Sequence, residues 1–536
     1  MQQRNHDGSH WLDGVRRPAR PALDHDLDAE VVVVGAGIAG LATAWELAAA
    51  GHETVVLEAD RILSGTTGGT TGKLTALHGL HYERLARTAG TEAAELYAAS
   101  HQDAMERATA LAGRLGIDAE FERRPAVTYV REGEAVREIR AETAAARAAG
   151  LDAHFVTETG LPFPVAGAVQ VPDQLQFHPG AFLTGLADAF TAAGGRIYEG
   201  TRVTGVEEHA RIRIDTATGP VVRAGDAVIA THFPPFGPVS LMVRLTPRRE
   251  LVVASPVPAA ADPQGMYLTR EERTRSVRTA PWPADPARRL LIVAGEAFRP
   301  GEGDPAEGWD RLERWARAWF PDFGSTGDVL RWAAQDIDSA DHLPYVGHLH
   351  PGTQHVYVAT GFGGWGLTGG LMAGRLIAAH VHGGPRPAWT ELYDPRRLTP
   401  VRGLPDLVGS QAGVASHYLG DRMHLPGPDA VRDLPPGGGI VVRDHRHPLA
   451  VHRDDAGELH SVSARCTHMG CLVAYDDAEQ VWECPCHGSR FTPDGTVLHG
   501  PATGPLPAEP LHARDAEHAD HTEQAEHGGH AGRHAP

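Results

Sequence analysis

Continuous apolar runs separated by glycine-rich turns characterise the chain after residue 30. Residues 31–34 are all valine, as in a buried strand, and a glycine-rich turn at 35–40 separates them from the apolar helical stretch 41–50. A second apolar run, 54–57, ends at Glu58. The pattern predicts a strand, a tight turn, a helix and a second strand that carries an acid at its end.

Farther along the chain, Ala-, Glu- and Arg-rich stretches predict helices. Residues 82–150 are mostly helical in pattern, apart from a break at 121–125 and a strand at 126–130, and another helix spans 178–195. Short β-like runs between 241 and 298 predict an antiparallel sheet. We therefore expect an α/β unit joined to an antiparallel sheet.

The C-terminal part has a different composition and predicts a separate all-β domain. Prolines and glycines at 435–439 precede the strand candidates 440–443, 449–452 and 460–463. We expect these parts: a polar N-terminal extension (1–29), the α/β unit with its inserted substrate domain (30–392), a proline-containing linker (393–415), the all-β domain (416–512) and a His-rich disordered tail (513–536).

Three glycines in the first turn have the spacing of a dinucleotide-binding fingerprint. Gly35, Gly37 and Gly40 follow the first strand and open the helix, so the backbone can approach a pyrophosphate at the helix N-terminus. Glu58 is placed to accept hydrogen bonds from ribose hydroxyls, and an acid there favours a ribose over a 2′-phosphate. The alternative is a tight turn without a ligand, and the flanking strand and acid favour the dinucleotide.

The next loop, residues 64–73, consists almost entirely of glycine, threonine and serine. Its position after the acid resembles the D-amino-acid oxidase, glycine oxidase and sarcosine oxidase family of FAD enzymes. In that family the matching loop, here with Thr66 and Thr67, packs against the isoalloxazine ring. The resemblance implies FAD, bound by an α/β Rossmann-like domain of the glutathione-reductase type with an antiparallel-sheet substrate domain. A plain flexible linker is the alternative for the loop. Some relatives bond the flavin through a histidine, at the place of Gly69, or through a cysteine, and we expect non-covalent FAD because this chain has neither available.

A second strand–glycine–helix pattern lies at 356–380. Its candidate cofactor-binding residues are Gly361, Gly363, Gly364 and Thr368. In the same family this segment directs a helix N-terminus at the pyrimidine end of the flavin, where it stabilises negative charge. The family also places backbone on the adenine side at the position of Val203. A glycine-rich turn without a ligand is the alternative.

Lys73 is the only lysine in the chain. The other 48 of the 49 lysine and arginine residues are therefore arginine (49 − 1 = 48). A lysine kept in such a chain suggests a role that arginine cannot fill, because lysine can lose its proton when buried. Sarcosine-oxidase relatives bind the substrate carboxylate with a lysine near the position of Thr368 and an arginine near 72–73. We interpret Lys73 as a candidate catalytic residue beside the flavin, with a structural lysine as the alternative.

All four cysteines lie in two short motifs near the C-terminus. The motifs read Cys466-Thr-His468-Met-Gly-Cys471 and Cys484-Pro-Cys486-His487-Gly-Ser489. They resemble the disulfide-bearing Rieske proteins of the respiratory and photosynthetic cytochrome complexes. A four-cysteine zinc site or two plain disulfides are the alternatives, and both leave the adjacent histidines unexplained.

The Rieske resemblance implies a [2Fe–2S] cluster with Cys466 and Cys484 on one iron and His468 and His487 on the other. It also implies a disulfide between Cys471 and Cys486. Ser489 keeps the hydroxyl that bonds a cluster sulfur in high-potential relatives, whereas Phe491 replaces their tyrosine. We therefore expect a reduction potential below the top of the Rieske range.

Charge and hydropathy exclude some classes of partner. The 536-residue chain has a formal net charge of −19, which argues against nucleic acid. Residues 1–30 lack the apolar core of an export signal, and no stretch predicts a transmembrane segment. We expect a cytoplasmic protein.

The motifs together predict a flavin dehydrogenase fused to its own electron acceptor. It would oxidise a small amine or amino-acid-like donor and pass electrons singly to the cluster, then to an external carrier through exposed imidazole edges of His468 and His487. The alternatives are an oxygen-using oxidase with a peripheral Rieske domain and an electron-transfer protein without an organic substrate. We also expect a chain truncated before Ile440 to fold, bind FAD and be bleached by substrate at a near-normal rate.

Overall fold

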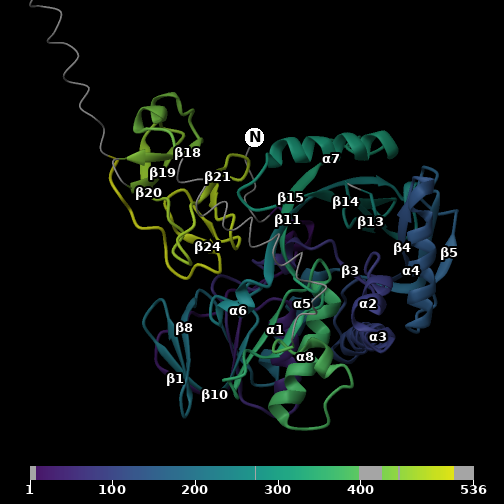
Figure 1. Cartoon of the computed structure of the whole chain (residues 1–536), viewed down its shortest axis with the longest axis horizontal. Coiled ribbons are helices and arrows are strands. Elements are labelled where there is room, and N and C mark those ends of the chain that lie inside the picture. The colour runs from purple at the N-terminus through teal and green to yellow at the C-terminus, as the bar shows by residue number, and fades with distance from the viewer. Residues whose placement is uncertain (1–7, 272, 398–424, 445–446, 512–536) are drawn as a thin grey trace, which may run out of the picture.

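The computed structural model describes residues 8–511, apart from 272, 398–424 and 445–446. Most of the predicted linker and the whole predicted tail lie outside the described residues. Figure 1 shows the described chain as a lower layer around β1, α1 and α8, an upper layer around β11 and α7, and a C-terminal β module beside both. We call residues 425–511 the C-terminal module.

The first sheet is the expected α/β unit. Its strand order is β16-β17-β10-β1-β2-β7. The pairings along β17-β10-β1-β2-β7 are parallel. In addition, β9 pairs with β10, and β8 pairs with β9. The strands are β1 Leu27–Val34, β2 Thr54–Leu57, β7 Arg196–Tyr198, β8 Val203–Glu208, β9 Ile212–Thr216, β10 Val221–Ile229, β16 Tyr345–His348 and β17 Val356–Thr360.

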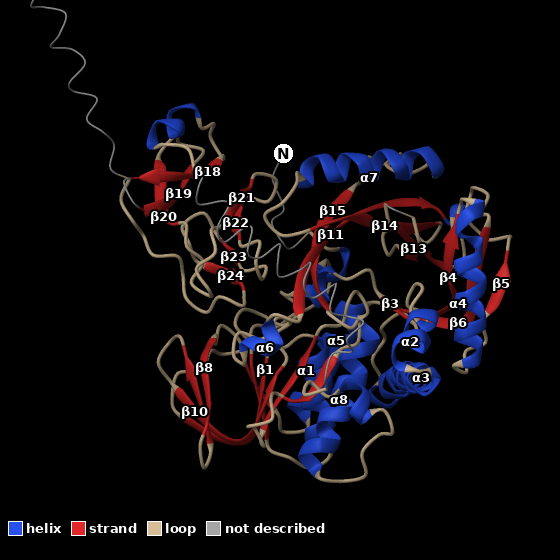
Figure 2. Ribbon diagram, in the orientation of Figure 1, coloured by secondary structure: helices blue, strands red, loops and turns tan. Residues whose placement is uncertain are grey.

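Helices cover one face of this sheet and explain the apolar run in β1. Helix α1 packs against α8 and α5 on that face (Figure 2). Val31 and Val33 belong to the core shared with these helices, whereas Val32 and Val34 belong to the core on the opposite face. A strand buried on both faces has a continuous apolar sequence. The helices of the described chain are α1 Ile38–Ala49, α2 Tyr82–Ala89, α3 Thr91–Leu115, α4 Val136–Ala148, α5 Pro179–Ala192, α6 Val239–Met242, α7 Pro305–Trp319, α8 Gly366–His382 and α9 Thr390–Tyr393.

The second sheet is mostly antiparallel, as the short β-like runs predict. Its order is β15-β11-β14-β13-β12-β4-β6-β3, with β5 paired to β6. Its strands are β3 Lys73–Leu74, β4 Glu122–Val130, β5 His154–Val156, β6 Gly167–Gln176, β11 Leu245–Pro258, β12 Met266–Thr269, β13 Arg275–Pro281, β14 Arg288–Phe298 and β15 Leu330–Ser339. Strand β4 begins earlier than predicted and includes Pro125. The register shifts between Arg124 and Ala126, and this irregularity accommodates the proline within the strand.

The C-terminal module consists of two small antiparallel sheets. The first is β18-β19-β20 and the second β21-β22-β23-β24. The strands are β18 Gly439–Asp444, β19 His447–Arg453, β20 Leu459–Ser463, β21 Ala474–Asp476, β22 Val481–Glu483, β23 Arg490–Phe491 and β24 Val497–His499. The two cysteine motifs occupy the loops before β21 and between β22 and β23.

The N-terminal segment before β1 contributes to the core. Trp11, in the short 3₁₀ helix His10–Leu12, is 0% exposed and donates its indole N–H to the carbonyl of Thr70 at 2.5 Å. A Cβ on Gly180 would lie 2.0 Å from the carbonyl oxygen of Trp11. The segment therefore packs against the loop at 64–73, although its composition is polar.

Candidate cofactor sites

The glycine turn between β1 and α1 lies very close to its neighbours. Gly35 has φ +101°, and a Cβ there would lie 2.5 Å from the carbonyl oxygen of Ala230. A Cβ on Gly40 would lie 1.9 Å from the carbonyl oxygen of Gly35. The amide of Ala36 donates a hydrogen bond to a carboxylate oxygen of Glu58 at 2.7 Å. The turn therefore fixes the acid beside the helix N-terminus, as dinucleotide binding requires.

A central cavity lies between this turn, the second sheet and the C-terminal module. The predicted cofactor residues in its lining are Gly35, Gly37, Glu58, Thr66, Thr67, Val203 and Gly364. The second sheet contributes Glu250, Gln335 and Asp336, and the C-terminal module contributes residues 498–503. These residues fit FAD, because the glycine turn leaves no room for side chains where the backbone must approach a pyrophosphate.

Two threonines fix the loop at 64–73 in this lining. The hydroxyl of Thr67 accepts a hydrogen bond from the amide of Ile38 at 3.1 Å, at the start of α1. The hydroxyl of Thr66 donates to the carbonyl of Gln335 at 2.9 Å, on β15. The loop is thus a bridge between the two sheets and not a free linker.

Four predicted cofactor residues lie outside the lining: Gly40, Gly361, Gly363 and Thr368. Gly361 and Gly363 have φ of +74° and +57° and turn the chain from β17 towards α8. Thr368 is buried and donates its hydroxyl to the carbonyl of Thr75 at 3.2 Å. These residues shape the turn, and their direct contact with FAD stays a prediction.

Lys73 lies on β3 and donates a hydrogen bond to the hydroxyl of Ser276. Burial lowers the pKa of Lys73 to about 8, although the neighbouring carboxylate of Glu250 favours the charged form. Glu250 lines the central cavity and Lys73 does not. The position of Lys73 beside the flavin therefore stays a prediction, whereas its neighbour Glu250 lies in the cavity lining.

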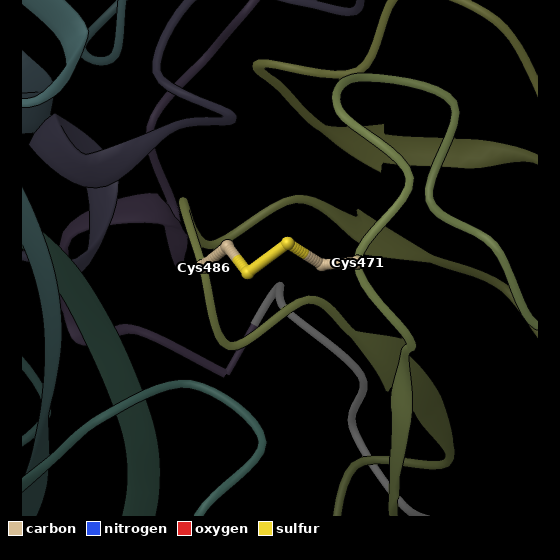
Figure 3. The surroundings of a disulfide bond; sticks show 2 residues. All are labelled: Cys471 and Cys486. Atoms are coloured by element: carbon tan, nitrogen blue, oxygen red, sulfur yellow. A yellow bond between two sulfur atoms is a disulfide. The ribbon is translucent and has the colours of Figure 1, made fainter. Parts of the chain in front are cut away.

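The two cysteine motifs contain one disulfide and two free thiols. Cys471 and Cys486 form a disulfide that clamps the two loops, as Figure 3 shows. Cys466 and Cys484 are free and buried. Because two cysteines are bonded and two are free, both alternatives for these motifs, the four-cysteine zinc site and two plain disulfides, are wrong.

The same two loops each carry a histidine with an unpaired ring nitrogen. The Nδ1 atoms of His468 and His487 are buried and have no hydrogen-bond partner among the described residues. Their ring centroids lie 4.9 Å apart, in an edge-on arrangement. Two thiols and two unpaired imidazole nitrogens are the donor set of a Rieske cluster, so these residues fit it.

The two free thiols share a hydrogen bond. It lowers the pKa of Cys466 to about 7 and raises the pKa of Cys484 well above its ordinary value. One thiol therefore ionises easily while the other holds the shared proton. Binding iron requires both thiolates, so this proton is released when the metal binds.

Ser489 connects this site to the loop after β24. Its hydroxyl accepts a hydrogen bond from the amide of Ala502 at 3.0 Å and is hydrogen-bonded to the thiol of Cys466. The hydroxyl of Thr467 donates to the carbonyl of Gly504 at 2.6 Å. Both cysteine loops thus hold the segment that lines the central cavity.

A phenylalanine after β10 lies between the two candidate sites. The ring centroid of Phe233 is 5.2 Å from that of His487 and 6.1 Å from that of His468, and Phe233 also lines the central cavity. His487 is only 7% exposed. The expectation of an exposed edge on His487 is wrong, because this imidazole packs against the flavin-side domain. Sequence reasoning did not identify Phe233, since nothing in its neighbourhood indicates a contact more than 200 positions away.

Buried charges also connect the second sheet to the C-terminal module. Arg249 on β11 is 1% exposed and pairs with Asp476 at 3.2 Å, Glu483 at 2.6 Å and also with Glu479. Arg490 pairs with Glu479 at 2.6 Å and with Glu483 at 2.8 Å. The three acids crowd together, and the two guanidinium groups offset part of their negative charge. This network fixes the module against the second sheet.

A dinucleotide cavity beside a buried two-cysteine, two-histidine centre defines a flavin oxidoreductase with an iron–sulfur cluster. The sequence profile of the DAO family, FAD dependent oxidoreductase, matches residues 30–380, and that of the Rieske [2Fe–2S] domain matches residues 429–510. The chain belongs to the DAO family of FAD dependent oxidoreductases and carries a C-terminal Rieske domain. Its cofactors are FAD and a [2Fe–2S] cluster.

Relatives share this organisation to different extents. The Rieske 2Fe-2S iron-sulfur protein YhfW of Bacillus subtilis is 30% identical over 500 residues, 93% of this chain and 96% of that protein. The gamma-glutamylputrescine oxidoreductase of Escherichia coli is 26% identical over 387 residues, 67% of this chain and 85% of that protein. Glycine oxidase from Geobacillus kaustophilus shares the fold, with a TM-score of 0.56 and 21% identity over 69% of this chain and 99% of its own. Among the helices of the described residues, none is long and apolar enough to cross a membrane.

Proposed function

We propose that the protein is a dehydrogenase that oxidises a small amine and passes its electrons, one at a time, to its own Rieske cluster. The bound flavin would take a hydride from the carbon next to the amine nitrogen, the nitrogen would lose a proton, and the resulting imine would be hydrolysed by water. Two one-electron transfers through the cluster to an external one-electron carrier would then restore the flavin. We propose the cytoplasm as the site of this reaction.

The observation that carries this proposal is the position of Phe233. It belongs to the lining of the central cavity and at the same time contacts the imidazoles of His487 and His468. A peripheral Rieske domain would have no need of such a contact. The cluster ligands face the flavin cavity through one buried aromatic side chain.

Acids on the second sheet support an amine as the substrate. Among the described residues, this sheet lines the central cavity with the carboxyl groups of Glu250 and Asp336 and with no lysine or arginine. Burial raises the pKa of Asp336 to about 7, and the nearby guanidinium of Arg248 opposes this rise. No described lysine or arginine of this sheet lines the cavity to pair with a substrate carboxylate. Glu250 offers a carboxylate to a substrate ammonium group, whereas Asp336 is already paired with Arg248 at 3.8 Å. The relative named as an oxidoreductase of gamma-glutamylputrescine supports the same class.

An anaerobic amine and amino-acid screen tests this function. Flavin absorbance and the electron paramagnetic resonance signal of the reduced cluster are recorded in the same sample of full-length protein. We expect a primary or secondary amine to bleach the flavin and then to reduce the cluster. A substrate that bleaches the flavin but leaves the cluster oxidised would contradict the electron path. In air, a peroxide yield equal to the substrate consumed would establish the oxidase alternative instead.

A further inference from the structure

We propose that the C-terminal module completes the FAD-binding site, so that FAD and the [2Fe–2S] cluster stabilise each other's binding. The proposal concerns the binding of two cofactors and does not depend on electron transfer between them. It rests on the shared lining of the central cavity, on hydrogen bonds that join this lining to the cluster loops, and on the buried contact between the domains.

One wall of the central cavity belongs to the C-terminal module. Residues 498–503 line it together with the glycine turn and Glu58. Arg202, which also lines the cavity, donates a hydrogen bond to the carbonyl of Val497 at 3.1 Å. A nucleotide held by the glycine turn therefore lies in a space that the first sheet only partly encloses.

The same wall is attached to both cluster loops. The amide of Ala502 donates to Ser489 in the second loop, and Thr467 in the first loop donates to the carbonyl of Gly504. Ser489 is in turn hydrogen-bonded to the thiol of Cys466. Loss of the cluster loosens these loops and with them the segment at 498–503.

The domain contact keeps the wall in place. Arg249 is held by three acids of the module, and the amide of Gly301 donates to Glu483 at 2.9 Å. Gly488, next to the ligand His487, packs so closely on β15 that a Cβ there would lie 2.5 Å from the side-chain nitrogen of Gln335. Gln335 itself lines the central cavity, so this contact of the module lies beside the FAD site.

Mutual stabilisation follows from this arrangement. If the cluster orders a wall that contacts FAD, FAD must favour the cluster-bound form by the same factor, because binding linkage is reciprocal. A chain truncated before Ile440, which the sequence predicts still binds FAD, should therefore bind it more weakly than the full chain.

The first test measures FAD affinity in full-length protein from which FAD has been removed and the cluster kept. Thr503→Trp places a bulky side chain in the cavity lining, and Thr496→Trp places the same side chain on an exposed position outside it. We expect Thr503→Trp to raise the Kd for FAD by about tenfold or more. A tenfold change in Kd corresponds to roughly 1.4 kcal/mol of binding free energy. Thr496→Trp is expected to match the wild type. Equal affinities in all three proteins, with intact cluster spectra, overturn the proposal.

The second test works from the cluster side and covers the case in which Thr503→Trp fails to fold. FAD affinity is compared between the wild type and the cluster-free variant Cys466→Ser, and the cluster's reduction potential is measured with and without FAD. We expect severalfold weaker FAD binding without the cluster and a potential that changes when FAD binds. If the cluster-free protein binds FAD as tightly as the wild type and the potential ignores FAD, the two sites are independent.

Discussion

The guanidinium of Arg249 lies 2.6 Å from the carboxylate of Glu483, and both side chains are 1% exposed. Arg249 belongs to the second sheet and Glu483 to the C-terminal module, so the pair is a buried ionic contact between domains. Asp476 and Glu479 lie next to Glu483, and burial, together with the crowding of acids, raises the pKa of Asp476 to about 6. The arginine therefore stabilises three carboxyl groups that lie close to one another.

Replacing Arg249 with methionine is expected to separate the domains or unfold the protein more easily. The change removes the arginine that pairs with Asp476 and leaves Glu479 and Glu483 paired with Arg490. Breaking a buried ion pair from one side costs about 3–5 kcal/mol. Chemical denaturation followed by tryptophan fluorescence measures the loss. Arg87→Met is the matched control, because Arg87 pairs with Glu83 on the surface of α2 and such pairs contribute about 0.3–0.5 kcal/mol. Equal losses in the two variants would show that the buried network does not hold the domains.

Much of this architecture could be predicted from local sequence. The run 31–34, the glycines after it and Glu58 are neighbours in sequence, and their chemistry is complete within one strand–turn–helix unit. The cysteine motifs are equally local, and the disulfide between Cys471 and Cys486 that the Rieske resemblance implied is confirmed. Local sequence patterns therefore predict those parts of a site whose residues lie in one or two neighbouring loops.

The contacts between domains could not be predicted in this way. Arg249 and Glu483 are 234 positions apart in the sequence, and the sequence separation of Phe233 and His487 is similar. Trp11 lies in a polar segment, yet it is buried against the loop at 64–73, where its indole N–H donates a hydrogen bond to the carbonyl of Thr70. In each case the partner is set by how the sheets and the module pack, and no periodicity in the sequence carries that information.

The cluster ligands are tested by exchanging one imidazole for a thiol. We expect His487→Cys either to lose the cluster or to change its absorption and electron paramagnetic resonance spectra towards those of a plant-type ferredoxin, since four thiolates lower the cluster's potential. His460→Ala, on an exposed part of β20, is the control. An unchanged spectrum in His487→Cys would show that this histidine is not a ligand.

A hydroxyl at position 491 is expected to raise the potential of the cluster. Ser489 already supplies one hydrogen bond to the thiol of Cys466, whereas Phe491 is fully buried and supplies none. Donors to cluster sulfurs stabilise the reduced form, which carries more negative charge. Redox titration of Phe491→Tyr checks this prediction. An unchanged or lower potential contradicts it.

Lys73 is expected to lower stability near neutral pH. Its pKa is about 8 in the folded protein and 10.5 in the unfolded chain, so the unfolded chain binds more protons between these values and stability rises with pH there. Below pH 8 both states are charged, and the difference of 10.5 − 8 corresponds to a cost of about 3 kcal/mol in the folded state. Lys73→Met should therefore be more stable than the wild type at pH 7, with a flatter profile between pH 8 and 10.

The same variant separates a functional from a structural role. If Lys73 acts at the flavin, Lys73→Met gains stability and loses turnover or shifts the flavin potential. Ser276→Ala, which removes only the hydrogen-bond partner of Lys73, is the control for a local packing effect. Normal turnover and a normal flavin potential in Lys73→Met would leave Lys73 as a structural residue.

The aromatic contact between the two sites gives the last prediction. Phe233→Leu keeps an apolar side chain in a position that is 1% exposed, but it removes the ring that faces His487 and His468. If electrons pass across this contact, substrate should still bleach the flavin at a near-normal rate, while the cluster is reduced severalfold more slowly. Anaerobic stopped-flow absorbance follows the first event, and freeze-quench electron paramagnetic resonance follows the second.

A matched leucine variant decides whether the ring itself matters. Phe190 on α5 is also buried, belongs to the core on the helical face of the first sheet and does not line the central cavity. Phe190→Leu should therefore show a comparable loss of packing and no delay in cluster reduction. Equal delays in both variants would attribute the effect to general destabilisation. A delay confined to Phe233→Leu, with an unchanged cluster spectrum, would place the transfer path at this ring, because binding, substrate oxidation and cluster assembly are then intact.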